Sequence, residues 1–262
     1  ALAVSMGEKA RVDMDYMCEL TGKTEEEIFA DLKGVIFLNP MHGYGNSTQA
    51  KYLMADEYLS GNVREKLALG RKSAELYPED YTVNVEALER VQPKDLTASE
   101  IAVRLGATWL PTEIVEQFMF EFLGTPRYAQ WNIKVHFSAY TGEWNIEGKS
   151  YDRSNVKAYS TYGTGRINAY KIIEETLNLK DVRIFDYVED ADGKKKAILN
   201  KNETAIAQAK QELIKQGFQD WVWSDPERRE RLCRLYNDKF NSLRPREYDG
   251  SHIVFSGMNP EI

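Results

Sequence analysis

Residues 111–146 read PTEIVEQFMFEFLGTPRYAQWNIKVHFSAYTGEWNI, and a change of pattern inside this stretch decides the fold class. Before residue 124, large apolar side chains recur at the spacing of one buried helix face, namely Ile114, Val115, Phe118, Met119 and Phe122. From Trp131 to Phe137 apolar and polar side chains alternate, and the alternation resumes at Trp144 after a turn. A helix followed directly by a β-hairpin predicts an α+β fold.

The sequence before this stretch has helical patterns. Asp13–Leu20 is expected to be one helix, and Thr24 and Glu27 have the spacing of a capping box that starts a second helix ending near Lys33. A short β-branched and aromatic run, Val35–Leu38, should form a strand. Further helices are predicted over Tyr58–Leu76, Asn84–Val91 and Thr97–Leu105.

The sequence after this stretch mixes both patterns. Two features lie between residues 167 and 199: a helix over Ile167–Leu177 and a second hairpin over Val182–Leu199 that turns at residues 190–193. Two helices follow, one over Glu203–Trp223 and one that starts after Ser224-Asp225-Pro226, with Ser224 as its expected cap. We therefore expect a mostly helical N-terminal half, and helices plus two β-hairpins in the C-terminal half. The predicted parts are a helix-turn-helix-like segment (1–46), a helical region (47–124) and a mixed α+β region (125–262).

The composition excludes several classes of protein. The chain is 42% apolar and 29% charged, as in ordinary globular proteins, and its apolar runs are far shorter than the roughly 20 residues that cross a bilayer. Cys18 and Cys233 have no neighbours at metal-ligand spacing, so we expect free thiols and a cytoplasmic protein with no membrane partner. Ala1–Met6 lacks the features of a signal peptide, and we expect an internal piece of a larger protein.

The charge differs between the two halves. Residues 1–124 hold 21 acidic and 12 basic side chains, for a net charge of −9, and residues 125–262 hold 20 and 22, for +2. The helix predicted from Thr24 carries Glu25, Glu26, Glu27 and Asp31. The outline of helix, turn, helix and strand suggests a recognition helix in the major groove, but this acidic face would repel phosphates. Packing or partner contact is the favoured interpretation of this segment.

Complete catalytic motifs are missing from the sequence. Gly70-Arg71-Lys72-Ser73 lacks the spacing of a nucleotide-binding loop, and Asn39-Pro40 lacks the ring that completes an adenine-methyltransferase loop. Asp190-Ala191-Asp192-Gly193 lacks two calcium ligands, and together with Asp186 and Lys194 it only loosely resembles a nuclease metal site. We therefore expect no catalytic residues, no metal ligands and no cofactor in this chain.

Two stretches suggest contact with nucleic acid. Tyr162-Gly163-Thr164-Gly165-Arg166 leads into a predicted helix, so that Thr164, Arg166 and backbone amides could hold one phosphate, although a simple helix-capping turn is the stronger interpretation. The last predicted helix and its tail combine aromatic residues with Arg228, Arg229, Arg231, Arg234, Lys239, Arg244 and Arg246. These cations and the Thr164 loop are the candidate DNA contacts.

Several strings of sequence, in this order, together resemble one family: Tyr58–Leu67 (YLSGNVREKL), Asn84–Leu88 (NVEAL), Val91–Pro93 (VQP), Leu105–Pro111 (LGATWLP), Tyr162–Thr164 (YGT) and Arg244–His252 (RPREYDGSH). That family is the large fused DNA methyltransferase and helicase proteins carried by conjugative elements and phages of Gram-positive and related bacteria. The resemblance covers nearly the whole chain. It implies an adenine-specific methyltransferase on the N-terminal side and a Swi/Snf-like helicase motor on the C-terminal side. ATP and S-adenosylmethionine would be used by those neighbours, and DNA would be the substrate.

These observations lead to one hypothesis with two alternatives. The chain is expected to be a non-catalytic domain that joins a methyltransferase to a helicase motor and positions DNA. A protein-interaction or dimerisation scaffold without DNA contact is the first alternative, and a cryptic metal-dependent nuclease is the second.

Overall fold

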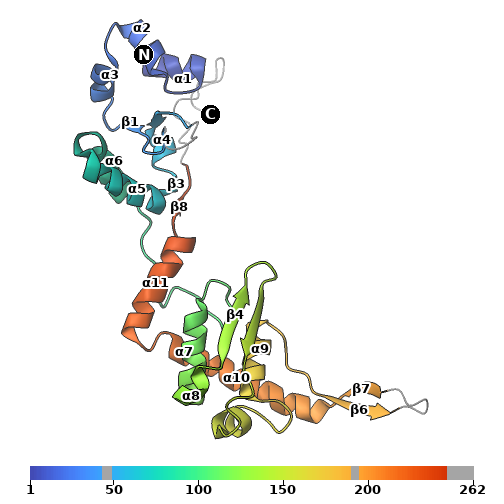
Figure 1. The fold of residues 1–262 in the computed structure, drawn as a ribbon. Coiled ribbons are helices and arrows are strands. Elements are labelled where there is room, and N and C mark those ends of the chain that lie inside the picture. Colours follow the sequence, from blue (N-terminus) through green and yellow to red (C-terminus); the bar gives the residue numbers. More distant parts are fainter. Residues whose placement is uncertain (43–48, 190–194, 247–262) are drawn as a thin grey trace, which may run out of the picture. The chain divides into compact units, whose positions relative to one another are not determined.

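A computed structural model of the chain describes residues 1–42, 49–189 and 195–246 (Figure 1). The chain forms two compact units, one made of residues 1–95 with 237–262 and the other of residues 96–236. Each unit is described by itself below. Among the described residues, no helix combines the length and the apolar character that crossing a membrane requires.

The first unit consists of short helices and two small antiparallel strand pairs, β1 with β2 and β3 with β8. Its elements are α1 (Leu2–Lys9), α2 (Met14–Thr21), α3 (Glu25–Asp31), β1 (Ile36–Leu38), β2 (Tyr52–Met54), α4 (Ala55–Tyr58), β3 (Gly61–Asn62), α5 (Val63–Leu76), α6 (Pro78–Arg90) and β8 (Leu243–Arg244). One apolar cluster lies under α2, α3 and β1, and a second lies between α4, α5 and α6.

The second unit contains the larger core and the two hairpins. Its elements are α7 (Thr112–Leu123), α8 (Arg127–Gln130), β4 (Lys134–Ser138), β5 (Glu143–Glu147), the π-helix η1 (Lys157–Thr161), α9 (Ala169–Leu177), β6 (Phe185–Glu189), β7 (Lys195–Leu199) and α10 (Lys201–Val222). Helix α11 (Pro226–Phe240) belongs to this unit up to Tyr236.

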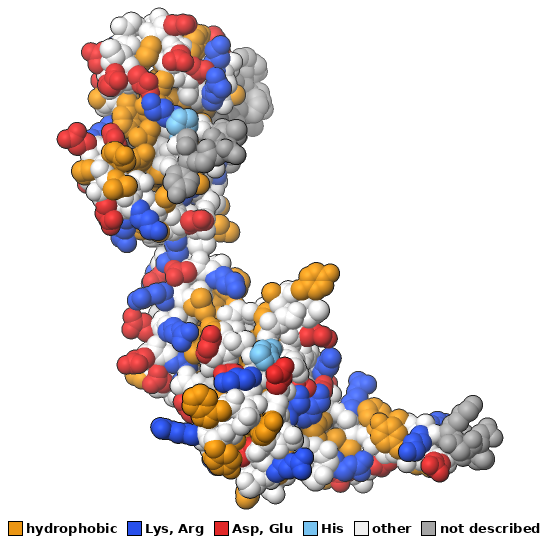
Figure 2. Space-filling view, in the orientation of Figure 1, with side chains coloured by type: hydrophobic (Ala, Val, Ile, Leu, Met, Phe, Trp, Pro, Cys, Tyr) orange, Lys and Arg blue, Asp and Glu red, His pale blue; other side chains and the backbone are white. Residues whose placement is uncertain are grey.

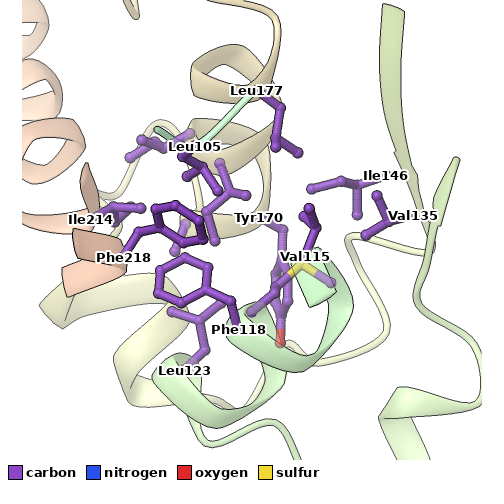
Figure 3. Packing of buried hydrophobic residues seen from close by; sticks show 14 of the residues in the cluster. Leu105, Val115, Phe118, Leu123, Val135, Ile146, Tyr170, Leu177, Ile214 and Phe218 are labelled. Atoms are coloured by element: carbon purple, nitrogen blue, oxygen red, sulfur yellow. The ribbon is translucent and has the colours of Figure 1, made fainter. Parts of the chain in front are cut away.

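The core of the second unit is built around α7. Phe118 is fully buried, and its ring meets that of Phe218 on α10 edge-on at a centroid distance of 5.1 Å. Figure 3 shows Val135 and Ile146 of the β4–β5 hairpin on the side of α7 where Val115 lies. Each fully buried side chain of this size contributes roughly 1.5–3 kcal/mol to folding. The apolar stripe predicted on α7 therefore joins the hairpin to α10.

The predicted α+β fold is confirmed. Both hairpins form, with Phe137 opposite Trp144 in the first and Tyr187 opposite Ala197 in the second. The predicted turn of the second hairpin lies outside the described residues. The helices predicted around residues 13–20, 24–33, 111–123, 167–177 and 203–223, and the helix after Pro226, are all present.

One predicted helix begins too early, and a second is wrong. The helix predicted over Tyr58–Leu76 starts only at Val63. Gly61 adopts a left-handed φ of 72°, and the side chain of Asn62 caps α5 by accepting a hydrogen bond from the amide of Glu65. Residues 97–105 form a turn and an extended segment. The amide of Thr97 does donate to the Glu100 carboxylate (2.9 Å), but residues 101, 103 and 105 are buried while 102 and 104 are exposed. A period of two is typical of a strand, whereas the capping-box spacing of Thr97 and Glu100 favours a helix.

One helix was not predicted, and another starts earlier than predicted. Helix α1 has no counterpart in the prediction, and its polar Ser5 is completely buried, where the hydroxyl donates to the carbonyl of Arg11 (2.8 Å). Helix α6 starts at Pro78 instead of Asn84, because proline is well tolerated in the first turn of a helix.

Candidate nucleic-acid interface

Helices α2 and α3 form the predicted helix-turn-helix. The Asp13 side chain caps α2, Gly22 ends it with a left-handed φ of 71°, and Thr24 and Glu27 form both hydrogen bonds of the capping box on α3. Strands β1 and β2 follow as a short antiparallel pair. Met17 and Ile28, which are buried, hold the two helices together.

The exposed side of α3 is acidic. The Glu25 carboxylate accepts hydrogen bonds from Lys51 and from the Tyr52 hydroxyl, both at 2.7 Å, and these bonds lower the pKa of Glu25. Glu26 is exposed, and Asp31 pairs with Lys23 at 2.5 Å. In Figure 2 acidic side chains are spread over the surface of this unit. A helix with this charge is poorly suited to lie against phosphates.

The loop predicted to hold a phosphate is closed on itself. The Thr164 hydroxyl accepts hydrogen bonds from the amides of Arg166 and Ile167, both at 3.2 Å. Helix α9 is capped by Asn168, whose side chain accepts from the Lys171 amide (2.9 Å). The amides of Thr164, Arg166 and Ile167 are therefore hydrogen-bonded within the turn, which fits the helix-capping interpretation.

Arg166 is held by its neighbours. Its guanidinium lies 2.9 Å from the carboxylate of Asp186 and donates to the carbonyl of Phe185 at 2.9 Å. Hydrogen bonds from Asn200 and Arg166 lower the pKa of Asp186. Asp186 is thus engaged in an ion pair, and the remaining residues of the nuclease-like and calcium-like patterns lie outside the described residues.

Arg228 is a structural residue. It is 6% exposed, its guanidinium carbon lies 3.5 Å from the centroid of the Trp221 ring, and it donates to the carbonyls of Val222 (3.1 Å) and Trp221 (2.7 Å). Both carbonyls lie in the last turn of α10, where the helix itself supplies no partner four residues on. The cap of α11 is Asp225, which accepts from the amide of Arg228 (2.7 Å), and the predicted cap Ser224 is not used in this way. Burial removes Arg228 from the candidate DNA contacts.

The other predicted cations fall into two groups. Arg229, Arg231 and Arg234 are exposed on α11 in the second unit, and Arg234 pairs with Glu230 at 3.0 Å. Lys239, Arg244 and Arg246 belong to the first unit. There the Lys239 ammonium lies 5.8 Å from the ring centroid of Phe240, Arg244 donates to the carbonyl of Leu59 (3.2 Å), and Arg246 donates to Asp56 (2.7 Å).

Comparison with known families gives two matches. Residues 104–242, more than half of the chain, match a family described as a domain of unknown function, DUF8437. The chain belongs to the DUF8437 family. Residues 1–49 match a second family, described as the winged helix domain of a probable helicase. No curated protein and no solved structure matches the chain.

The winged-helix match agrees with the geometry of the first unit. It covers α1, α2, α3 and β1, the segment in which the capping box and the Gly22 turn build the helix-turn-helix. The N-terminal segment is therefore helicase-associated. The DUF8437 match starts at Arg104 and includes all of α7 to α11, so its residues form the core of the second unit.

The DUF8437 region carries cations that the sequence patterns did not reveal. Arg104, Lys180 and Arg183 are exposed and line two adjoining hollows of the surface. They are isolated in the sequence, so no run of charge marks them, and only the fold of α9 and α10 brings them together. Residues 181–185 do alternate between exposed polar or aromatic and buried aliphatic side chains, and this alternation is a sequence signal that could have placed Arg183 on the surface.

Metal ligands are not gathered anywhere in the described part of the chain. Across residues 1–42, 49–189 and 195–246, no three side chains of His, Cys, Asp or Glu lie together as a metal site would require. His136 lies near one acid, Glu147, at 3.5 Å. The candidate interface is thus defined by its charges and exposed rings.

Proposed function

We propose that this chain is a non-catalytic domain that positions DNA for a helicase motor carried by the same protein. The observation that carries the proposal is the match of residues 1–49 to the winged helix domain of a probable helicase, in a segment that folds as a helix-turn-helix with a strand pair. The exposed cations of the second unit support DNA contact through the phosphate backbone, which fixes position without reading sequence.

We further propose that the parent protein joins an adenine-specific DNA methyltransferase to that motor. The support is the resemblance of several strings to the fused methyltransferase and helicase proteins of conjugative elements and phages. In this proposal ATP and S-adenosylmethionine bind to the neighbouring domains, and the partners of this chain are those domains and DNA.

Residues of one resembling string hold the first unit together. The Lys66 ammonium donates to the carbonyls of Glu57, Tyr58 and Ser60 at 2.8–3.1 Å, which caps the end of α4. Arg64 donates to the carbonyls of Asn241 (2.8 Å) and Pro93 (3.3 Å), so it joins α5 to two distant segments of the same unit. A domain that positions its neighbours must hold its own segments in place, as these hydrogen bonds do.

An interaction scaffold without DNA contact is the second candidate. The acidic surface of α3 favours it, because that surface suits a basic protein partner better than a phosphate backbone.

The test is the salt dependence of DNA affinity for the 262-residue chain, measured by fluorescence anisotropy on a labelled duplex. We expect Arg229→Gln/Arg231→Gln/Arg234→Gln to weaken binding and to flatten the slope of log affinity against log salt by about 0.9 for each phosphate that is no longer neutralised. Arg228→Gln is the matched control, because it removes one positive charge from the same helix at a buried position. It should lower the melting temperature and leave the slope unchanged. Absence of DNA binding by the unmodified chain would leave the scaffold as the better explanation.

A further inference from the structure

Two hollows of about 300 and 600 Å³ adjoin on the second unit, and they share Leu179, Lys180 and Asp181 as their common wall. The smaller is also lined by Arg104, Gln211 and Lys215, and the larger by Lys171, Arg183 and Phe185. These residues come from the segment before α7, from α9 and α10, from the segment that links α9 to β6, and from the start of β6. We call the surface formed by these residues the basic strip. It consists of Arg104, Lys171, Leu179, Lys180, Asp181, Arg183, Phe185, Gln211 and Lys215.

The cations of the basic strip are incompletely neutralised. Lys171 pairs with Glu174 and Glu175, and Lys215 pairs with Glu212. Within the described residues, Arg104, Lys180 and Arg183 make no ion pair, although Asp181 stands on the shared wall. Lys180 lies just beyond the C-terminal end of α9, where the helix dipole stabilises a positive charge. Arg104 and Arg183 do not follow the end of a helix, so the helix dipole does not stabilise their charges. Three exposed, unpaired cations around adjoining hollows suit a ligand with several negative charges.

The shared wall is also strained and fixed in place. Leu179 has a left-handed φ of 58°, a conformation usually taken by glycine after a helix, and its side chain is 60% exposed. Behind it, buried Gln211 accepts from the amide of Val182 (3.2 Å) and donates to the carbonyl of Lys180 (2.8 Å). The wall therefore presents an apolar side chain and a cation from a preformed backbone.

Aromatic rings continue the basic strip onto the hairpin. Arg183, Phe185 and Tyr187 alternate with Val182 and Ile184, which are buried, so the three point to one face. Tyr187 is 72% exposed and lies opposite Ala197 on a hairpin whose side chains are nearly all exposed. Lys195 and Lys196 are exposed on the other strand. The hairpin projects from α10 in Figure 1, and Figure 2 shows hydrophobic and basic side chains side by side on it.

We propose that the basic strip binds single-stranded DNA, with phosphates along Arg104, Lys180 and Arg183 and with bases stacked on Phe185 and Tyr187. Cations that follow a backbone beside rings that stack on bases are the features by which proteins hold single strands without reading sequence. The proposal rests on the proposed function, since it takes DNA as the ligand, and it names the strand form and the residues that hold it.

The experiment measures binding of the 262-residue chain to a labelled 15-nucleotide oligothymidine and to a 15-base-pair duplex across about 50–200 mM salt. We expect the single strand to bind more tightly than the duplex. Arg104→Gln/Lys180→Gln/Arg183→Gln should flatten the single-strand salt slope by about 0.7 for each phosphate that is no longer neutralised. The control Lys33→Gln/Lys72→Gln/Arg90→Gln removes the same charge from exposed positions of the first unit and should leave the slope nearly unchanged.

A second pair of variants tests the rings. Tyr187→Ala should weaken single-strand binding roughly tenfold, whereas Tyr140→Ala, which removes a ring that is 99% exposed at the turn of the other hairpin, should not. If the triple variant loses its melting transition, the single variants Lys180→Gln and Arg183→Gln give the slope. Equal slopes for the strip and control variants, equal effects of the two tyrosine changes, or tighter duplex binding would overturn this inference while the proposed function stands. Failure of the unmodified chain to bind either DNA would overturn both.

Discussion

Glu174 carries a negative charge in the interior of the second unit. It is 5% exposed, lies 2.5 Å from the ammonium groups of Lys149 and Lys171, and accepts from the amide of Ile146 (2.8 Å). Burial by itself would raise the pKa of Glu174, but the hydrogen bonds from the two lysines and the amide outweigh it and lower the pKa. A carboxylate of this kind ties α9 to the β4–β5 hairpin.

The lowered pKa has a consequence for stability. Stabilisation by Glu174 is fully present above the pKa of the unfolded chain, near 4.5, and is lost as the pH falls through the lower pKa of the folded state. We expect Glu174→Gln to reduce the free energy of unfolding by about 1–3 kcal/mol at pH 7 and to reduce its loss on acidification. Urea denaturation at several pH values measures both. Exposed Glu113→Gln is the control, and equal stability of the two variants would contradict the assignment.

The two glycines of the Thr164 loop differ in the space around them. A Cβ atom on Gly163 would lie 2.3 Å from the carbonyl oxygen of Ala158, whereas one on Gly165 would meet nothing within 4 Å. Gly163→Ala should therefore lower the free energy of unfolding by roughly 1–3 kcal/mol, and Gly165→Ala should stay within about 0.5 kcal/mol of the unmodified chain. Thermal or urea unfolding of the two variants measures the difference. Equal stability would show that the turn is less tightly closed than its hydrogen bonds indicate.

At the scale of elements, α3 combines a buried apolar side with an exposed acidic side. Its buried Ile28 and the hydrogen bonds of Glu25 to Lys51 and Tyr52 fix the helix against β2, and Glu26 remains exposed. If α3 packs or meets a protein partner, Glu26→Gln should leave DNA affinity unchanged or raise it slightly, because it removes one repulsive charge. Anisotropy titrations at low salt measure this effect. A marked loss of affinity in a folded variant would instead make α3 a recognition helix.

Elements with a strong local signal could be predicted from the sequence. The period of 3.6 in α7, the period of two in β4 and β5, and the capping box of α3 all agree with burial in the folded chain. Residues 97–105 could not be assigned in the same way, since one hydrogen bond of a capping box, from the Thr97 amide to the Glu100 carboxylate, forms there without a helix after it. The spacing of apolar residues predicted one helix over Tyr58–Leu76, but the left-handed Gly61 separates α4 from α5.

The candidate interface was only partly predictable, for a physical reason. A run of arginines marks α11 as basic, but sequence cannot show that Arg228 lies under Trp221 while Arg229 faces solvent. Arg104, Lys180 and Arg183 share a surface because α9 and α10 pack together, and this long-range packing leaves no local pattern. Conversely, the Thr164 loop has the composition of an anion site, but its hydroxyl is hydrogen-bonded to its own backbone amides.

At the scale of the whole molecule, the two units match different families. The first unit contains the helicase-associated segment with its acidic α3, and the second, which holds most of the DUF8437 match, contains the basic strip and the exposed Tyr187. We therefore propose that the second unit contacts the backbone and bases of DNA, and that α3 does not read sequence.

Hydrogen–deuterium exchange of the 262-residue chain, with and without saturating oligonucleotide, tests this division of roles most directly. We expect slower exchange on addition of DNA in peptides that cover residues 177–189 and the start of α11. Exchange in residues 24–32, which contain α3, should be unchanged. Slower exchange confined to α3, or no change anywhere in the chain at saturating DNA, would contradict it.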